Sequence, residues 1–545
     1  MYYFTTSKLF LLPSFDLEVE EQGKIDKFLL FLDNSGVGEI INRYIKNETS
    51  KGGRPSCNYY RLFATILYGF AFDKCTLREL ETACKFDLRY ITLMEQTKVD
   101  YTTFSKFINK VIMPNEKEIF SKLCSQIKKE AEIEFDDAFI DGTKFEANAN
   151  KYKFVWKPIT YHKNISVKAN EIIKNNCLIN NYREEEMIRS STIALAISNP
   201  NIEGRDYKAL FSILTKVLEY EEKERLCGPN RKSYYKTDID ATAMALKADY
   251  YSGKGSNMHA AYNVQILVIK GYVFSYFISQ SRTDINDFIP TIDSFYSNYK
   301  VFPKRICADS CYGTPNNYKY LYDNNIENYV KFQSYEGIVS GSNPECYKIN
   351  KDETITCLNG NTGYEVKIEN RHPKKAKSVF YKIEGCNECG FKMYCKRFMS
   401  DVTENFKVFE CNKTYQFQKQ KALENLLSCK GIEMRVNRSI QVEGTFGIQK
   451  QDYGRTRYRR RGLERVAIET MLNFLGHNIA KLFRYFESNK HPNFWVAPEN
   501  LDCQKIKKPS CKRLSKKGAK TNEKVNKKKW GFSTSLACWI FKLKV

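Results

Sequence analysis

Long apolar runs are missing from this chain, which has 545 residues. The longest run, Leu62–Phe72, has 11 residues, whereas a helix that spans a bilayer needs about 20. Lys8 precedes a short apolar stretch near the N-terminus, but no cleavage site of small residues follows it. We therefore expect neither a membrane anchor nor a secretory signal. Gly253–Gly255 lacks the spacing of a Walker phosphate loop, so we expect no ATP site.

The cysteines lack the spacing of a disulfide scaffold. The chain has 18 of them, and most are scattered singly along the sequence. A long basic chain without export signals keeps its thiols reduced. We therefore expect a soluble protein of the cytoplasm.

Acidic residues are too few to balance the basic ones. The chain has 87 Lys and Arg against 63 Asp and Glu, which gives a net charge of +24. This excess is larger than solubility requires, and it indicates a polyanionic partner such as nucleic acid. Hydrophobic residues make up 42% of the chain, so it can bury a substantial core.

Residues 1–135 carry apolar side chains at helical spacing, which predicts an all-α N-terminal domain. The predicted helices cover Phe28–Ile45, Tyr59–Phe72 and Leu77–Cys84, and Asp100 can cap a further helix. A small basic helical domain ahead of a catalytic core is typical of DNA binding. A helical bundle without that role is the alternative.

From residue 136 onward the hydrophobic period changes, and residues 136–333 read as the first part of an α/β core. A polar stretch at about 160–230, with apolar residues at helical spacing, reads as a helical insertion. The strands predicted in this part are Ala138–Ile140, Ala260–Ile269, Tyr272–Ile278, Arg305–Ala308 and Tyr329–Phe332, and the predicted helices are Asp287–Tyr299 and Pro315–Asn324.

The rest of the chain falls into three parts. Residues 334–430 are turn-rich and contain cysteines, and residues 431–490 return to helices of the core. Residues 491–545 form a basic tail, in which positions 505–529 have 12 Lys and Arg against one acid. We expect this tail to be a disordered basic arm.

Two aspartates follow short apolar strands in the predicted core. Asp141 comes directly after one such strand, and Asp309 comes directly after another. A carboxylate at the carboxyl end of a buried strand lies at the edge of a sheet and faces a crevice. Two of them, with a third from a helix, can hold a pair of Mg²⁺ ions for phosphodiester displacement. The alternative is that each aspartate is only a turn or cap residue.

The third carboxylate lies in a strongly basic stretch, Arg435–Arg465, with nine bases against three acids. Glu443 and Lys450 are seven residues apart, so on a helix they share a face. A lone carboxylate there suits a metal ligand beside a phosphate-binding surface. A solvated basic face with one salt-bridging Glu is the alternative.

An ordered set of segments resembles bacterial insertion-sequence transposases of the DDE, ribonuclease H-like superfamily. The resemblance is to the group with a helical N-terminal DNA-binding domain and a cysteine-containing insertion before the catalytic Glu. The matching segments are Gly53–Pro55, Leu77–Glu81, Asp100–Phe107, Phe139–Lys144, Tyr262–Gln265, Ala308–Gly313, Val442–Gly447 and Arg459–Gly462.

The resemblance implies an α/β, ribonuclease H-like mixed sheet flanked by helices, with insertions. It implies that Asp141, Asp309 and Glu443 are the catalytic triad and bind two Mg²⁺ (or Mn²⁺) ions. The family's signature helix, Tyr-x2-Arg-x3-Glu-x6-Lys, fits from Glu443 to Lys450. In the upstream half, Ser439 stands at the Arg position and Val436 at the Tyr position.

Lys450 is expected to contact a phosphate near the cleaved DNA end, and Arg438 and Arg435 are the nearest substitutes for the two missing motif residues. Tyr453 and Tyr458 lie among the arginines and can stack on unpaired bases. The expected set of phosphate-binding residues is Arg435, Arg438, Lys450, Arg457, Arg459, Arg460 and Arg461.

The implied function is that of a DNA transposase. It would bind the terminal inverted repeats of its element and catalyse Mg²⁺-dependent cleavage and strand transfer. Its partners would be double-stranded DNA, from the terminal repeats and the target, and further copies of itself in a dimer or higher multimer. We expect it at the bacterial nucleoid. The alternatives are a metal-dependent endonuclease that only hydrolyses and an inactive, zinc-containing DNA-binding relic.

Four cysteines in the turn-rich insertion can form a zinc site, and two of them have the spacing of a zinc knuckle. Cys386 and Cys389 form a CxxC pair, Cys395 follows six residues later, and Cys357 lies well upstream. Four thiolates can form a closed tetrahedral Zn²⁺ site that orders a segment without a core of its own. Unligated thiols are the alternative.

Overall fold

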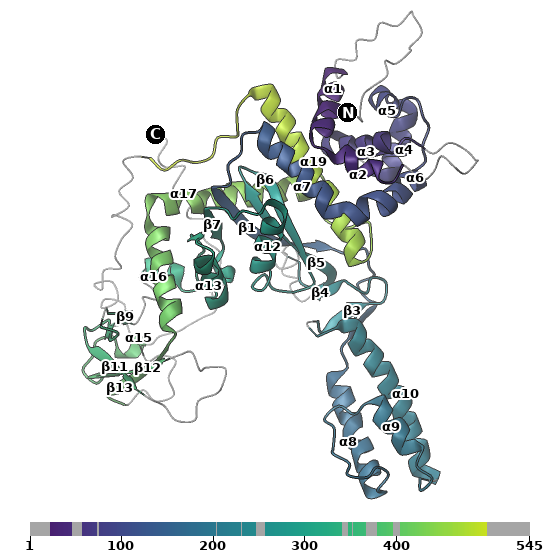
Figure 1. Cartoon of the computed structure of the whole chain (residues 1–545). Helices are drawn as coiled ribbons and strands as arrows, with labels where there is room; N and C mark the ends of the chain where they lie inside the picture. The colour runs from purple at the N-terminus through teal and green to yellow at the C-terminus, as the bar shows by residue number, and fades with distance from the viewer. Residues whose placement is uncertain are drawn as a thin grey trace, which may run out of the picture. The chain divides into compact units, whose positions relative to one another are not determined.

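The structure is a computed structural model, and it divides the chain into two compact units. Of the described residues, those in 22–333 and 414–498 form the first unit, and those in 334–413 form the second. Figure 1 shows the whole chain. The residues that the structure describes are 22–45, 57–73, 76–202, 204–229, 231–246, 257–340, 347–350, 352–366, 379–395 and 404–498. The predicted arm at 505–529 lies outside them.

The N-terminal part of the first unit is helical, as predicted. Local capping explains several helix starts: Asn58 accepts the amides of Tyr60 and Arg61, and Asp100 accepts the amide of Thr103 at 2.8 Å. The elements are α1 (Gln22–Asn34), α2 (Val37–Asn42), α3 (Tyr59–Tyr68), η1 (Gly69–Asp73), α4 (Leu77–Phe86), α5 (Leu88–Leu93), α6 (Tyr101–Phe107), η2 (Ile108–Ile112), η3 (Met113–Asn115) and α7 (Glu116–Glu130).

A mixed sheet follows these helices. β1 pairs antiparallel with β5 and parallel with β7, β5 pairs antiparallel with β6 and β4, and β7 pairs parallel with β8. The strand order is β4-β5-β1-β7-β8, with β6 also beside β5. The strands are β1 (Asp137–Glu146), β4 (Thr242–Met244), β5 (His259–Ile269), β6 (Tyr272–Ser279), β7 (Arg305–Ala308) and β8 (Glu327–Asn328).

Two strand predictions need correction. β1 does not stop at Ile140, because its ladder with β5 continues to the pair Glu146–Ala261. The strand predicted at Tyr329–Phe332 is not formed. The short strand β8 lies just before it, and its pairing with β7 ends at Asn328.

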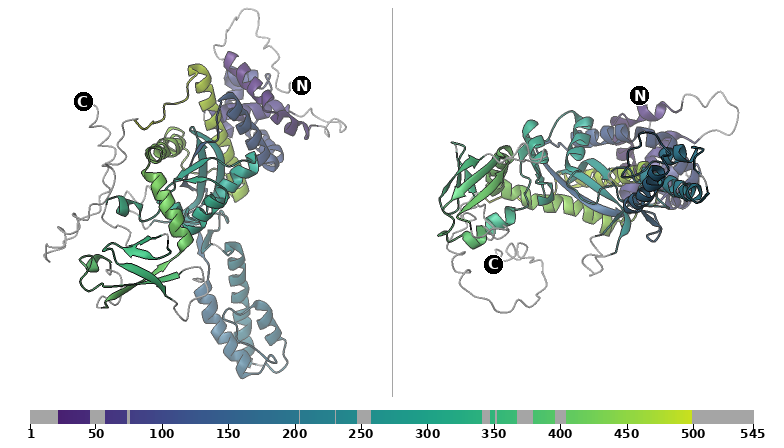
Figure 2. Two further views of the ribbon diagram at one scale, coloured as in Figure 1. Left: turned by 60° about the vertical axis from the view of Figure 1, so that its left-hand side comes forward. Right: turned by 90° about the horizontal axis from the view of Figure 1, so that it is seen from below.

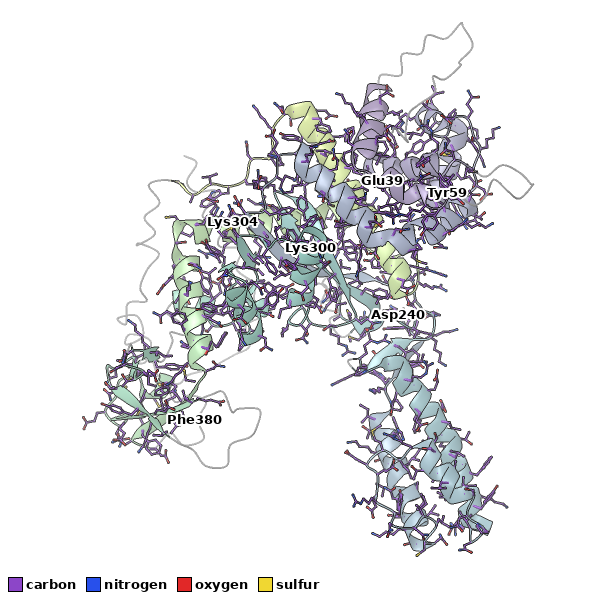
Figure 3. All side chains as sticks on the ribbon, in the orientation of Figure 1. Glu39, Tyr59, Asp240, Lys300, Lys304 and Phe380 are labelled. Carbon is purple, nitrogen blue, oxygen red and sulfur yellow. The ribbon has the colours of Figure 1, made fainter. Side chains whose placement is uncertain are left out.

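Long helices pack against the sheet and join it to the N-terminal helices. α12 (Phe288–Tyr299) and α19 (Leu463–Ser488) contact β6, and α19 also contacts α7 and η1 (Figure 2). Gly476 of α19 permits this approach, because a Cβ there would lie 2.3 Å from the carbonyl oxygen of Phe70. At the start of the parallel pair β1–β7, Lys304 lies 2.8 Å from Asp136 (Figure 3).

The predicted helical insertion is present between β1 and β4. It consists of α8 (Ile159–Asn175), α9 (Ser190–Ile197) and α10 (Gly204–Cys227), which bury a small core of their own. A two-stranded ribbon of β2 (Phe154–Trp156) and β3 (Ser233–Tyr235) leads into and out of the helices (Figure 1).

The second unit has a separate antiparallel sheet with the order β13-β12-β11-β10-β9. Ile355, Tyr381 and Ile383 lie in its core. Its elements are α14 (Tyr335–Ser340), β9 (Tyr347–Ile349), β10 (Ile355–Cys357), β11 (Thr362–Val366), β12 (Val379–Glu384), α15 (Lys392–Cys395) and β13 (Phe406–Cys411).

The mixed α/β class and the helical N-terminal region are therefore confirmed. No helix in the described part of the chain is long and apolar enough to cross a membrane. The expectation that all thiols are reduced is wrong at Cys429, which is disulfide-bonded. The described cysteines that form no disulfide are Cys57, Cys84, Cys124, Cys177, Cys227, Cys307, Cys311, Cys357, Cys386, Cys389, Cys395 and Cys411.

Candidate functional site

Asp141 and Asp309 lie at neighbouring positions of two parallel strands. The β1–β7 ladder ends with the pair Ile140–Ala308, and the two aspartates are the next residue of each chain segment. Asp141 accepts the amide of Gly142 at 2.8 Å. Asp309 accepts the amide of Ser310 at 2.7 Å. The sequence predicts that the strand ends at Asp141, but β1 continues past it to Glu146. Asp141 instead marks the point where β1 loses its parallel neighbour β7.

The surroundings of Asp141 disfavour its negative charge. Burial raises the pKa of its carboxyl group, and the nearby Asp309 and Asp284 carboxylates raise it further. The Arg438 guanidinium opposes these effects and lowers the pKa. The site is therefore a partly buried cluster of carboxylates, and the positive charge of Arg438 offsets their mutual repulsion.

Arg438 joins two residues of the predicted triad. Its Nη1 donates to Asp141 Oδ2 at 2.7 Å, and its Nη2 donates to Glu443 Oε1 at 3.1 Å. Arg438 ends α17 (Cys429–Arg438), and the next turn, η6 (Ser439–Glu443), is π-helical. A π-helical turn brings residues five apart into line, whereas an α-helix does so for residues four apart.

This turn explains the departure from the signature helix. The motif places its arginine four residues before the Glu, where this chain has Ser439. In the π-helical turn Arg438 also reaches Glu443, at 3.1 Å, and its contact is shorter than that of Ser439 Oγ, at 3.4 Å. Arg435 lies one turn earlier in α17, and its Nε donates to the carbonyl of Gly431 at 3.2 Å. The phosphate-binding roles of Arg435 and Arg438 remain predictions.

Lys450 lies over β1 close to Asp141. It belongs to a second π-helical turn, η7 (Ile448–Asp452), which follows α18 (Gly444–Gly447). Its Nζ donates to Thr143 Oγ1 at 2.6 Å and lies 4.8 Å from the centre of the Phe145 ring. Thr143 is two residues from Asp141, so both side chains are on the same face of β1.

The donor chemistry fits a divalent cation in part. Asp141 and Asp309 offer adjacent carboxylate oxygens, the ligands that Mg²⁺ prefers, and their mutual repulsion is what a cation would relieve. Glu443 is turned toward Arg438 instead. Among the residues that the structure describes, no group of three or more His, Cys, Asp or Glu side chains is arranged to hold a metal ion.

A polar network beside Asp141 was missed by the sequence reasoning. Asp284 accepts the side-chain amides of Asn263 at 2.5 Å and Gln265 at 2.8 Å. Gln265 in turn accepts the Tyr312 hydroxyl at 2.5 Å. Tyr262–Gln265 is one of the matching segments, but Asp284 lies in a loop with no strand or motif that signals a role.

Four of the predicted phosphate-binding arginines line a cleft of about 780 Å³ in the first unit, whereas Arg435 and Arg438 do not. One wall is the loop between η7 and α19, and the other includes α4 and α6 of the N-terminal helices. Of the described residues, seven arginines and a single acid, Glu469, line the cleft. Four of these arginines are predicted from the sequence; the full set is Arg78, Arg455, Arg457, Arg459, Arg460, Arg461 and Arg465.

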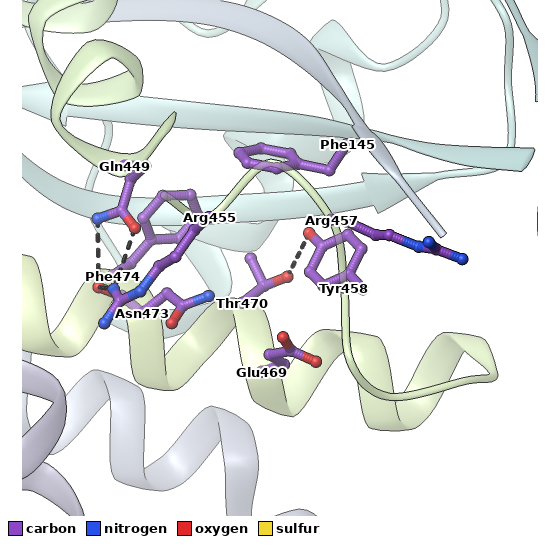
Figure 4. A pocket seen from close by; sticks show the side chains of 9 residues that line it. All are labelled: Phe145, Gln449, Arg455, Arg457, Tyr458, Glu469, Thr470, Asn473 and Phe474. Atoms are coloured by element: carbon purple, nitrogen blue, oxygen red, sulfur yellow. Dashed lines mark hydrogen bonds between the residues drawn. The ribbon is translucent and has the colours of Figure 1, made fainter. Parts of the chain in front are cut away.

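Glu469 of α19 holds the arginine loop (residues 455–461) in place. Its carboxylate accepts the amide of Arg459 at 3.1 Å and that of Arg460 at 3.0 Å. Burial lowers the pKa of Arg455 to about 10. The Arg455 side chain binds Gln449 and stays inside the fold (Figure 4). The exposed members of the loop are therefore the ones that can meet a phosphate: Arg457, Arg459 and Arg461.

The prediction that Tyr458 stacks on bases is wrong. Its ring is buried against Phe145 and Tyr262, and its hydroxyl bonds Thr470 at 2.8 Å (Figure 4). Tyr453 lines the cleft, and its ring centre lies 4.6 Å from the Arg455 guanidinium.

The four cysteines predicted to hold zinc line one small cavity of the second unit, Cys357, Cys386, Cys389 and Cys395. Lys407 lines it too, and its Nζ lies 3.1 Å from Cys395 Sγ. A cation beside that sulfur favours its thiolate form. The sulfur atoms of these described cysteines are not arranged to hold a metal ion, so the zinc site remains a prediction.

Comparisons with known proteins identify the class. Residues 356–483 match the family described as "Transposase DDE domain", and residues 17–110 match "Transposase domain (DUF772)". The first match contains Glu443, Lys450 and the arginine loop, and the second contains helices α1 to α6. The chain thus has the domains of a DDE-type transposase, which confirms the family expected from the sequence.

Within that class, the two matches are consistent with an insertion-sequence transposase. No curated protein matches the chain. A solved structure, the cryo-EM structure of a piggyBac transposase synaptic complex with hairpin DNA, is similar at 8% identity, over 94% of this chain and 88% of that chain, with a TM-score of 0.28.

Proposed function

We propose that this chain is a DNA transposase that binds the terminal inverted repeats of its element and catalyses metal-dependent cleavage and strand transfer. The observation that carries the proposal is the adjacent pair Asp141 and Asp309 with Arg438 and Glu443 beside it. The sheet supports a ribonuclease H-like core, because β6, β5 and β1 are antiparallel to one another in turn while β1, β7 and β8 are parallel.

Asp141, Asp309 and Glu443 would hold two Mg²⁺ or Mn²⁺ ions. Such ions stabilise the attacking and leaving oxygens of an in-line displacement at phosphorus. Arg438 lowers the pKa of Asp141 against the effect of burial, and it positions Glu443. Lys450 supplies a fixed positive charge two residues along β1, where the phosphate next to the cleaved bond would lie.

Double-stranded DNA would lie in the arginine-lined cleft. Arg459 and Arg461 bind backbone phosphates there, because exposed guanidinium groups recognise phosphate oxygens in pairs. Arg78 of α4 extends the same surface onto the N-terminal helices. A dimer or larger assembly on DNA, implied by the resemblance, belongs to the same proposal, and so does a structural Zn²⁺ held by the four cysteines of the second unit.

The test uses the full chain and a supercoiled plasmid that carries the two ends of the element, with Mg²⁺ or Mn²⁺. We expect excised and joined products, and we expect Asp141→Asn and Glu443→Gln to abolish them while end binding persists. Glu433→Gln is the matched control, because Glu433 lies in α17 and pairs with Lys430 at 2.6 Å. Nicking without joining would support the endonuclease instead. Binding without strand breakage under either metal would support the inactive relic.

A further inference from the structure

Aromatic and basic residues alternate where the chain leaves the sheet for the helical insertion. Between positions 151 and 157, the even positions are aromatic and three of the four odd ones are lysine. The aromatic residues are Tyr152, Phe154 and Trp156. Side chains of a strand alternate between its two faces, so Phe154 and Trp156 share one face of β2.

These aromatic rings are exposed. The exposed fractions are 79% for Tyr152, 43% for Phe154 and 49% for Trp156. The Phe154 and Trp156 rings contact each other edge to face, with centroids 5.7 Å apart. Neighbouring exposed aromatic side chains form an apolar patch of the kind that marks a binding surface.

Cations lie against the same rings. The Arg282 guanidinium lies 5.4 Å from the centre of the Trp156 ring, and Lys151 Nζ lies 5.2 Å from that of Tyr152. Nη2 of Arg282 is buried without a hydrogen-bond partner in the described part of the chain. A ligand for this patch therefore needs a flat apolar face to lie on the rings. It also needs a negative charge or an acceptor oxygen to pair with the cations.

The patch is connected to both parts of the candidate site. Arg282 is two residues before Asp284, which raises the pKa of Asp141. The end of β1 and the residues just after it bind the arginine loop. The amide of Glu146 donates to the carbonyl of Thr456 at 3.1 Å, and Nε of Arg461 donates to the carbonyl of Asn148 at 2.8 Å. A DNA strand bound along the arginine loop has only this short segment to cross before it meets the rings.

We propose that Tyr152, Phe154 and Trp156 form a stacking platform for unpaired DNA bases. Bases within a duplex already stack on each other, so only an unpaired base can offer its face to an aromatic ring. Lys151 and Arg282, the cations that lie against these rings, hold the backbone of the same strand. The platform rests on the proposed function, because it takes the single-stranded DNA next to the cleaved end, and it replaces Tyr458 as the stacking residue.

The experiment measures how tightly the full chain binds two fluorescent probes. One probe is a single-stranded oligonucleotide of 20 thymidines, and the other is a 20-base-pair duplex. Phe154→Leu/Trp156→Leu keeps apolar bulk at both positions but removes the aromatic faces. The matched control is Tyr207→Leu/Phe211→Leu, because these two rings on α10 are also exposed, at 42% and 55%, and stack at 6.4 Å.

We expect the platform variant to lose about tenfold or more in affinity for the single strand and less than twofold for the duplex. The control variant should change neither affinity. An Arg282→Gln variant should weaken single-strand binding in the same direction. Thermal unfolding of each variant shows whether its fold is intact.

A platform variant that binds the single strand as tightly as the unchanged chain would overturn the inference, and so would an equal loss for both probes. These outcomes differ from failure of the proposed function. In that case the unchanged chain would bind neither probe, or it would bind the duplex without cutting any end.

Discussion

Nη2 of Arg438 lies 3.1 Å from Oε1 of Glu443, although the two residues are five positions apart in the chain. The π-helical turn Ser439–Glu443 makes this contact possible. π-helical turns within longer helices are frequent at functional sites. Here the arginine lies one position earlier than in the motif, and the π-helical turn adds one residue between it and Glu443, so the two changes compensate each other. The chain keeps an arginine–glutamate pair that its motif spacing had made doubtful.

Arg438 should therefore stabilise the carboxylates as well as position them. Arg438→Ala leaves the partly buried Asp141 beside Asp309 and Asp284 without its cation, and we expect a loss of about 3 kcal/mol in the free energy of unfolding at neutral pH. Mg²⁺ at millimolar concentration should restore more stability to this variant than to the unchanged chain, because the ion replaces the missing charge. Urea unfolding with EDTA and with Mg²⁺ measures both effects.

Arg435→Ala is the matched control for that experiment. Arg435 lies one turn earlier in the same helix and donates to a backbone carbonyl of its own helix. We expect no added benefit from Mg²⁺ in this variant. An equal response to Mg²⁺ in both variants would mean that Arg438 does not stand where a cation binds.

Much of the fold could be predicted because its signals are local. Asp100 caps α6 by accepting the amide of Thr103, and the strands β5 and β6 are mostly apolar and lie on either side of a tight turn. The end of β1 could not be predicted in this way. Gly142, Thr143 and Lys144 have no apolar pattern, and they remain in the strand because β5 pairs with them.

The candidate site shows the same limit. The two aspartates could be found from their strands, whereas the pairing of Arg438 depends on a π-helical turn that helical spacing does not reveal. The cleft brings Arg78 together with Arg465, which are far apart in the sequence. Only the folded chain can place residues so distant side by side.

The exposed arginines of the cleft should determine how DNA binding depends on salt. Arg459→Gln/Arg461→Gln removes two phosphate contacts, and we expect the slope of log affinity against log salt concentration to fall by about 1.8 for a duplex probe. Binding titrations from about 50 mM to about 200 mM salt measure the slope.

The control for this prediction is Arg205→Gln/Arg225→Gln on α10. Both arginines are exposed, and neither lines the cleft. The control removes the same charge from the chain, so it separates a local contact from the effect of net charge. An equal change of slope in both variants would show that the cleft is not the DNA surface.

The cysteine cavity of the second unit should contain zinc in protein prepared without chelator. We expect about one Zn²⁺ per chain by elemental analysis, since four thiolates complete a tetrahedral site. Cys386→Ser/Cys389→Ser should lose the metal and lower the thermal stability of the second unit. Cys177→Ser is the control, because Cys177 is exposed and lies in the helical insertion. A zinc content that stays the same in the double variant would contradict the prediction.

Asp287 should make the stability of the chain depend on pH. Its side chain is 4% exposed, and burial, with the nearby Asp284, raises the pKa of its carboxyl group to about 7 from the ordinary 3.8. At a pH between 3.8 and about 7, Asp287 is therefore protonated in the folded state and ionised in the unfolded state. The contribution of this group to stability is present below about pH 4 and is lost as the pH rises through about 7.

Asp287→Asn imitates the protonated carboxyl group and removes this dependence. We expect the variant to match the unchanged chain at about pH 4 and to exceed it by about 4 kcal/mol in the free energy of unfolding at about pH 8. Urea unfolding at about pH 4, about pH 6 and about pH 8 measures the difference. Asp293→Asn, at an exposed position of the same helix α12, should show no such trend. The prediction is contradicted if the difference in stability between Asp287→Asn and the unchanged chain stays constant with pH. That outcome would mean that Asp287 has the same pKa in the folded and unfolded states.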